Sequence, residues 1–151
     1  MLALAVTTAV LARPGAAGAG TVEDAADAGG PLDIARADVH QSGRDLDMRL
    51  ETHGEWDPAQ LQDRPTTAPG QGESYACIEL HQDEQHALAC VGQDGAHPEV
   101  GYTRFDASGG VVEQRVLGRA DVRAGSNFFR ARVDPGGIGI AHGPFQWRAV
   151  T

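Results

Sequence analysis

Hydrophobic residues recur at every second position in most of this chain, and this period limits the fold more than any other feature. Apolar side chains alternate with polar ones from Ala35 to Val39 and again from Leu46 to Thr52. A period of two is that of a strand with one buried face, because successive side chains point to opposite faces. Similar short runs follow, with turn-forming residues between them, at 76–91, 100–106, 111–118, 120–125, 128–134 and 145–150.

This pattern predicts an all-β fold. Seven to nine short strands, with turns about every 8 to 12 residues, are typical of an antiparallel two-sheet β-sandwich of the jelly-roll or immunoglobulin-like kind. In the first hairpin, a central Ser42-Gly43 turn would place Val39 opposite Leu46. Asp57 and Pro58 then predict the start of a single helical turn.

The first 31 residues differ in composition from the rest of the chain. Residues 1–19 contain an apolar run from Leu2 to Ala12 and an Ala17-Gly18-Ala19 step, the pattern of a cleaved export signal. The run is too short for a bilayer, which needs about 20 residues. An export signal normally has a basic residue before its apolar run, and this chain has none. The alternatives to an export signal with a complete start are therefore an incomplete or misassigned start and an alanine-rich disordered tail. Residues 20–31 are small and acidic and predict a flexible leader, which leaves 32–151 as the sandwich domain.

Charge argues against one class of partner. The formal net charge is −9, and all twelve basic residues are arginine, a bias typical of high-GC bacterial genes. A surface this acidic repels phosphate backbones, so we expect no nucleic-acid partner. We also expect no membrane span in the mature chain.

The segment CIELHQDEQHALAC, residues 77–90, holds both cysteines and two of the six histidines. A hairpin centred on Asp83-Glu84 would place Cys77 opposite Cys90, and His81 opposite His86. Along a strand, Cys77 and His81 would then lie about 13 Å apart. Four ligands of one zinc ion must each lie about 2.0–2.3 Å from the metal, so this geometry excludes a Cys₂His₂ zinc site.

A disulfide fits the same hairpin, because directly opposed residues have the separation that a bridge requires. We therefore predict a Cys77–Cys90 disulfide, in keeping with an exported protein. His81 and His86, with Glu79, could hold a surface metal ion; the alternative is two solvent-exposed histidines beside a turn.

Catalytic and nucleotide-binding motifs are absent from the sequence. GGIGIAHG has His142 where a phosphate-binding loop needs its third glycine, and no helix is expected after it. There is no G-x-S-x-G and no H-E-x-x-H. A hydrolase stays an alternative, because catalytic residues can assemble from distant loops, and His53, His97 and His142 are its candidates.

Aromatic residues supply the candidate binding positions. Phe128 and Phe129 are adjacent in a strand, so one is core and the other faces outward. Trp147 alternates with Phe145 and is expected in the core. Trp56 stands at a strand end, where it either plugs the sandwich or forms a rim platform on which a sugar ring stacks.

The opening segment PLDIARADVHQSGRDLDMRLETHGEW resembles the first hairpin of secreted β-sandwiches that include family-9 carbohydrate-binding modules and DOMON-like domains. The closing FQWRAV resembles their last strand, so the similarity spans residues 31–151. The resemblance implies binding, not catalysis, and Trp56 is the position that matches their exposed tryptophans. Haem-binding members use a Met and a His, but Met48 shares a face with Leu46 and Leu50 and is expected in the core.

These observations predict a secreted, non-enzymatic binding module without a cofactor, with a carbohydrate as the ligand and Trp56 and Phe128 as candidate contacts. The alternative is a structural or protein-interaction domain of the bacterial cell envelope. The expected partner is accordingly a glycan or an envelope protein.

Overall fold

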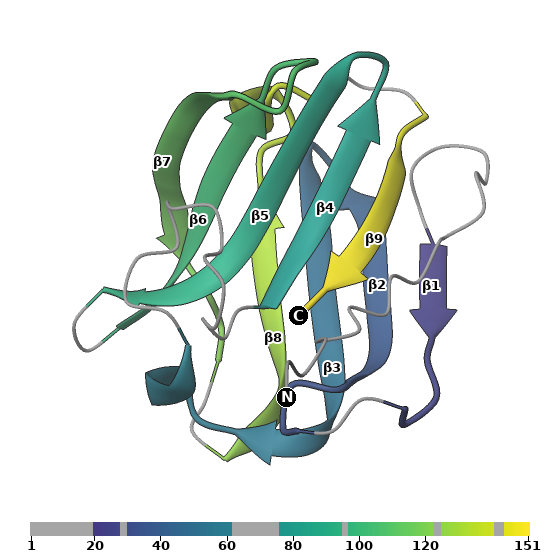
Figure 1. Ribbon diagram of the computed structural model, residues 1–151, viewed down its shortest axis with the longest axis vertical. Coiled ribbons are helices and arrows are strands. Elements are labelled where there is room, and N and C mark those ends of the chain that lie inside the picture. The colour runs from purple at the N-terminus through teal and green to yellow at the C-terminus, as the bar shows by residue number, and fades with distance from the viewer. Residues whose placement is uncertain (1–19, 28–29, 62–75, 95–96, 123–124, 141–143) are drawn as a thin grey trace, which may run out of the picture.

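The computed structural model describes residues 20–27, 30–61, 76–94, 97–122, 125–140 and 144–151. The predicted export signal, residues 1–19, and the loop expected at 62–74 lie outside the described residues. Two antiparallel sheets pack face to face (Figure 1). This arrangement confirms the predicted all-β sandwich.

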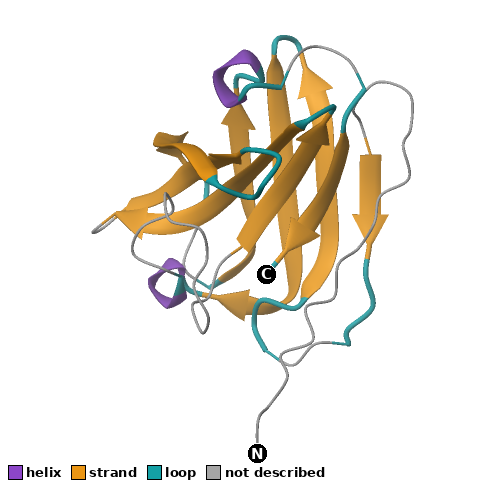
Figure 2. Cartoon of the chain, turned by 45° about the horizontal axis from the view of Figure 1, so that its top comes forward, coloured by secondary structure: helices purple, strands orange, loops and turns teal. Residues whose placement is uncertain are grey.

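Nine strands form the two sheets in the described part of the chain. The four-stranded sheet has the order β1 (Gly20–Glu23), β2 (Ile34–Ser42), β3 (Asp45–Trp56) and β8 (Ser126–Val133). The five-stranded sheet has the order β7 (Val111–Arg119), β6 (His97–Phe105), β5 (Gln85–Asp94), β4 (Ala76–Gln82) and β9 (Gln146–Val150). Two short 3₁₀ turns, η1 (Pro58–Gln60) and η2 (Gly136–Ile138), are coloured purple in Figure 2.

The first hairpin forms, but its register differs from the predicted one. Ser42 pairs with Asp45, so the turn is Gly43-Arg44, and Val39 lies opposite Met48, not opposite Leu46. Gly43 has a φ of 66°, and the first central position of a tight hairpin turn favours glycine for that conformation. Most residues of β2 pair with the residue two positions further along β3 than predicted. A shift by two keeps the same side chains facing the core.

The core lies between the inner faces of the two sheets. Trp147 and Phe145 are buried, which confirms the predicted core stripe at the end of the chain. Phe129 is buried and Phe128 is half-buried on the opposite face of β8. Met48 is fully buried, as expected for a core residue.

Two segments differ from the sequence prediction. The expected leader at 20–31 begins with a strand, since β1 pairs antiparallel with β2 along Gly20–Glu23 and Val22 packs against the core. Backbone pairing with β2, the contact of Val22 with the core and a hydrogen bond from Thr21 to Asp38 join this short strand to the sheet. The strand expected at 120–125 is reduced, in its described part, to one bridge between Asp121 and Arg130.

Asp47 is a buried acid on the outer face of the four-stranded sheet, with its side chain 2% exposed. Arg130 donates from Nε to Oδ1 over 2.7 Å, and Arg132 donates to Oδ2 over 3.2 Å. The hydrogen bond from Arg130 is the main reason that the pKa of Asp47 lies below its usual value of 3.8, against the opposing effect of burial.

This carboxylate gives the fold a defined acid sensitivity. Because the folded state lowers the pKa of Asp47, its contribution to stability is present above pH 3.8 and is lost as the pH falls below that value. We expect Asp47→Asn to be less stable than the wild type at pH 7, and the difference to shrink below pH 3.8. Urea unfolding of both proteins from pH 7 downward measures this, and two parallel stability profiles would contradict it.

Candidate functional site

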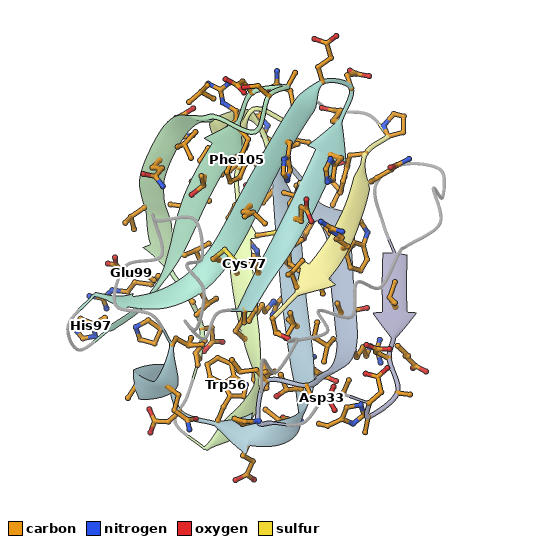
Figure 3. The ribbon with its side chains drawn as sticks, viewed as in Figure 1. Asp33, Trp56, Cys77, His97, Glu99 and Phe105 are labelled. Carbon is orange, nitrogen blue, oxygen red and sulfur yellow. A yellow bond between two sulfur atoms is a disulfide. The ribbon has the colours of Figure 1, made fainter. Side chains whose placement is uncertain are left out.

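The candidate site lies on the outer face of the five-stranded sheet, where one row of opposed residues crosses four strands. Gln146 of β9 lies opposite His81 of β4, His81 opposite His86 of β5, and His86 opposite Phe105 of β6. The two imidazole rings stack with centroids 4.5 Å apart, and His86 stacks on Phe105 at 4.8 Å. Figure 3 labels Phe105 on this sheet. The row therefore holds two histidines in a defined orientation.

Glu79 lies in the neighbouring row, two residues before His81 on β4, and its side chain is only 5% exposed. His81 Nε2 is 2.9 Å from Glu79 Oε1 and hydrogen-bonded to it. Arg148, which lies opposite Glu79 on β9, donates from Nε to Oε2. The two carboxylate oxygens thus have separate partners, Arg148 on one side and the histidines on the other.

The surroundings keep Glu79 ionised. Burial alone would raise the pKa of Glu79. The hydrogen bond and charge of Arg148, with contributions from His81 and His86, outweigh burial and lower the pKa below its usual value of 4.5. A carboxylate therefore faces both imidazole rings at neutral pH.

His86 has an unusual contact. Its Nε2 lies 2.6 Å from Glu79 Oε1, but the two groups are not aligned for a hydrogen bond. The nitrogen is itself buried, and within the described residues it has no hydrogen-bond partner. One ligand atom from each of Glu79, His81 and His86 lies within 4.8 Å of the other two. The three residues that the sequence suggested as a surface metal site therefore have ligand atoms close enough together to bind one ion.

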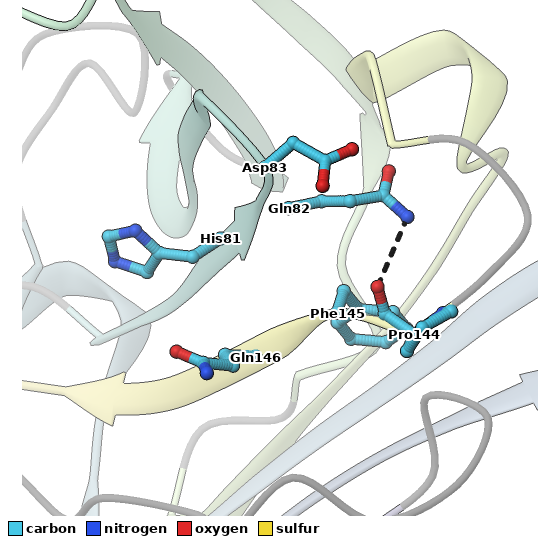
Figure 4. A pocket seen from close by; sticks show the side chains of 6 residues that line it. All are labelled: His81, Gln82, Asp83, Pro144, Phe145 and Gln146. Atoms are coloured by element: carbon cyan, nitrogen blue, oxygen red, sulfur yellow. Dashed lines mark hydrogen bonds between the residues drawn. The ribbon is translucent and has the colours of Figure 1, made fainter.

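A surface pocket of about 250 Å³ adjoins this cluster and shares His81 with it. The turn between β4 and β5 and the segment that leads into β9 form its walls (Figure 4). Gln82 donates a hydrogen bond to the carbonyl of Pro144 across the pocket. The lining combines apolar rings with an imidazole, amides and a carboxylate: His81, Gln82, Asp83, Pro144, Phe145 and Gln146.

Asp83 adopts a backbone conformation that favours glycine. Its φ is 52°, and it is the one non-glycine residue with a positive φ in the part of the chain that the structure describes. Aspartate tolerates this region better than most residues, but at a cost in conformational energy. The carboxylate at this position thus lines the pocket despite a strained backbone.

No protein-family model matches the chain. Searches of curated proteins and of solved structures also found no match. The resemblance to carbohydrate-binding and DOMON-like modules therefore stays a prediction. Among the described residues, no helix is long and apolar enough to cross a membrane.

The predicted cysteine pair is brought together. Cys77 and Cys90 lie directly opposite each other, their sulfur atoms are 2.03 Å apart, and Figure 3 draws the bond beside Cys77. Both residues are buried, although they lie on the outer face of the sheet. The pair is compatible with an extracytoplasmic protein. It also leaves neither sulfur available as a metal ligand.

Trp56 does not form a rim platform. Its side chain is 2% exposed, so it plugs the end of the sandwich, the first of the two alternatives. A ring with no exposed face has no surface for a sugar to stack on, which removes Trp56 from the candidate contacts. Phe128 is half-buried, and the guanidinium of Arg49 lies over its ring at 4.9 Å.

Of the three histidines considered for hydrolysis, the two that the structure describes are not part of this site. His53 is exposed, with Nε2 3.1 Å from the carbonyl oxygen of Asp24, and His97 is exposed at the start of β6. His142 lies outside the described residues. In the described part of the chain, the cluster that combines histidines with a buried carboxylate is the one on β4 and β5.

Sequence reasoning missed Arg148 and the pocket wall at residues 144–146. The alternation in FQWRAV places Arg148 on the face opposite Trp147, so its outward direction was available from the sequence. Its partner was not, because the pairing of β9 with β4 joins segments about seventy residues apart.

Proposed function

We propose that this protein is a non-catalytic binding module that acts outside the cytoplasm and takes a carbohydrate-type ligand at the pocket beside His81. The observation that carries the proposal is the composition of the pocket wall. The imidazole and amide groups can donate or accept hydrogen bonds, and the carboxylate accepts them, so the wall offers both roles that the hydroxyl groups of a sugar require. Pro144, which is exposed, adds apolar surface against which the C–H groups of a ring can pack, and only the small exposed part of Phe145 lines the pocket beside it.

The size of the pocket limits the ligand. At about 250 Å³ it is smaller than the roughly 300–1,000 Å³ of pockets that enclose drug-sized molecules. It suits one sugar unit, such as the end of a glycan chain, better than an extended oligosaccharide. The buried Cys77–Cys90 pair supports an oxidising location for such a module.

Asp83 offers a test that separates binding from folding. Asp83→Gly removes the carboxylate from the pocket and relieves the positive-φ backbone, so we expect a variant at least as stable as the wild type, by up to about 1 kcal/mol. A thermal-shift screen of soluble glycans should find a sugar class that stabilises the wild type. At about 100 times its Kd, the ligand should add roughly 2.7 kcal/mol of stability. Asp83→Gly should lose most of this shift.

Glu84→Ala is the matched control. Glu84 follows Asp83 in the same turn and carries the same charge, but it does not line the pocket. We expect this variant to keep the ligand-induced shift. The proposed function would be overturned if no glycan in the screen stabilised the wild type. It would also be overturned if the ligand-induced thermal shift were equal in Asp83→Gly and the wild type.

A protein-interaction domain is the second candidate, and the edge strand β7 favours it. β7 ends the five-stranded sheet and exposes Val111, Val112 and Val116 by 45–50%. An edge with apolar side chains can accept a strand from a partner. This candidate predicts concentration-dependent association in size-exclusion chromatography that Val116→Lys abolishes. A monomer at all concentrations would argue against association of the protein with itself through this edge.

A further inference from the structure

We propose that Glu79, His81 and His86 form a three-ligand site for a zinc-class divalent cation on the outer face of the five-stranded sheet. This inference goes beyond the proposed function and does not depend on sugar binding in the neighbouring pocket. Glu79 would supply Oε1, and the two histidines would each supply Nε2. The combination of two imidazoles with one carboxylate is a ligand set that zinc takes in proteins, with a fourth position left for water.

The ligand atoms are already close to the required separations. Zinc binds imidazole nitrogen and carboxylate oxygen at about 2.0–2.2 Å, so two ligands of a tetrahedral ion lie about 3.3 Å apart. Glu79 Oε1 is 2.9 Å from His81 Nε2 and 2.6 Å from His86 Nε2. One ligand atom from each of the three residues lies within 4.8 Å of the other two. Shifts of about an ångström or less at the carboxylate contacts would admit the ion.

The unsatisfied nitrogen of His86 is the observation that points to a cation. His81 already donates to Glu79 Oε1, while His86 Nε2 lies against the same oxygen without forming a hydrogen bond. A buried polar atom without a hydrogen bond is costly and needs an explanation. A cation between the nitrogen and the oxygen would bind the lone pairs of both.

The rings can reach the necessary orientation from the protein surface. A metal lies close to the plane of each imidazole that binds it, whereas the rings of His81 and His86 are stacked at an interplanar angle of 8°. They must therefore tilt toward each other on binding. Their side chains are 44% and 33% exposed, which leaves room for rotation without a change in the backbone.

Arg148 determines which cations the site prefers. It binds Glu79 Oε2, which fixes the carboxylate with Oε1 toward the histidines. It also neutralises the charge of Glu79, so affinity depends mainly on the two imidazole nitrogens. Magnesium and calcium require several oxygen ligands, and they should bind far more weakly than zinc.

The test is calorimetric titration of the oxidised full-length chain with Zn²⁺ at neutral pH, after removal of bound metal with EDTA. We expect binding of one ion per chain, weakened at least about tenfold in His81→Asn, His86→Asn and Glu79→Gln. His97→Asn is the matched control, because His97 is an exposed strand histidine away from the cluster. The Zn²⁺ affinity of this variant should equal that of the wild type. Mg²⁺ at the same concentrations should give no binding heat.

Thermal melts in EDTA identify any variant that does not fold. If Glu79→Gln is one of them, the two histidine variants decide the outcome, because both side chains are partly exposed. The proposal is overturned if the wild type does not bind Zn²⁺, or if His81→Asn and His86→Asn bind as tightly as His97→Asn. Asp83→Gly should keep the full zinc affinity, so failure of the glycan site and failure of the zinc site are distinguishable.

Discussion

Replacing Trp56 by alanine should destabilise the fold by about 3–5 kcal/mol, the range typical of a buried aromatic residue that leaves a cavity. Trp56 ends β3 and is 2% exposed at the end of the sandwich near η1 (Figure 3). It belongs to the main hydrophobic core, and its carbonyl accepts a hydrogen bond from Gly125 N. Loss of the indole would thus remove packing between the two sheets at this end.

Urea unfolding measures this effect, with Phe128→Ala as the control. Phe128 is half-buried, and Arg49 lies over its ring, so truncation should cost clearly less than truncation of Trp56. A Trp56→Ala variant with wild-type stability would contradict the buried position. If the same variant also lost glycan binding, the rim-platform interpretation would be restored.

Removal of the Cys77–Cys90 bond should have the second largest effect, a loss of about 3 kcal/mol in the free energy of unfolding. The bond joins residues 13 apart and restricts the unfolded chain, which is the main source of disulfide stabilisation in the chain-entropy model. The double variant Cys77→Ala/Cys90→Ala and the chemically reduced wild type should both show the loss, measured by urea unfolding.

Mass spectrometry provides the control for that experiment. Reduction of the wild type should add the mass of two hydrogen atoms, and the double variant should show no change. Because Cys77 and Cys90 are both buried, we expect reduction under native conditions to be slow and to become fast on unfolding. A wild type with two free thiols when purified under oxidising conditions would contradict the disulfide.

The strand pattern was predictable because a period of two reports directly which residues share a face. In β4 and β5 it also gave the register, since the opposed pairs Cys77–Cys90 and His81–His86 follow once the turn is placed at Asp83-Glu84. In the first hairpin the same reasoning put the turn one residue too early. Alternation identifies a face, but the conformation of Gly43 decides which two residues make the turn.

Pairings between distant segments were not predictable in this way. The alternation of Arg148 does not reveal that β9 lies beside β4, and four residues of a small acidic segment gave no indication that β1 would join β2. Periodicity also does not tell how far a face is covered. Glu79 is on the outer face of its sheet, yet it is buried, and this burial makes its contacts with the two histidines informative.

Both proposals place a binding site at the end of the outer face around His81. The most direct test is chemical-shift mapping by NMR of the oxidised full-length chain, with Zn²⁺ and with the stabilising glycan added separately. We expect zinc to perturb residues around Glu79, His81 and His86, and the glycan to perturb residues 81–83 and 144–146. Perturbations confined to β7, or no perturbation with either ligand, would contradict this expectation.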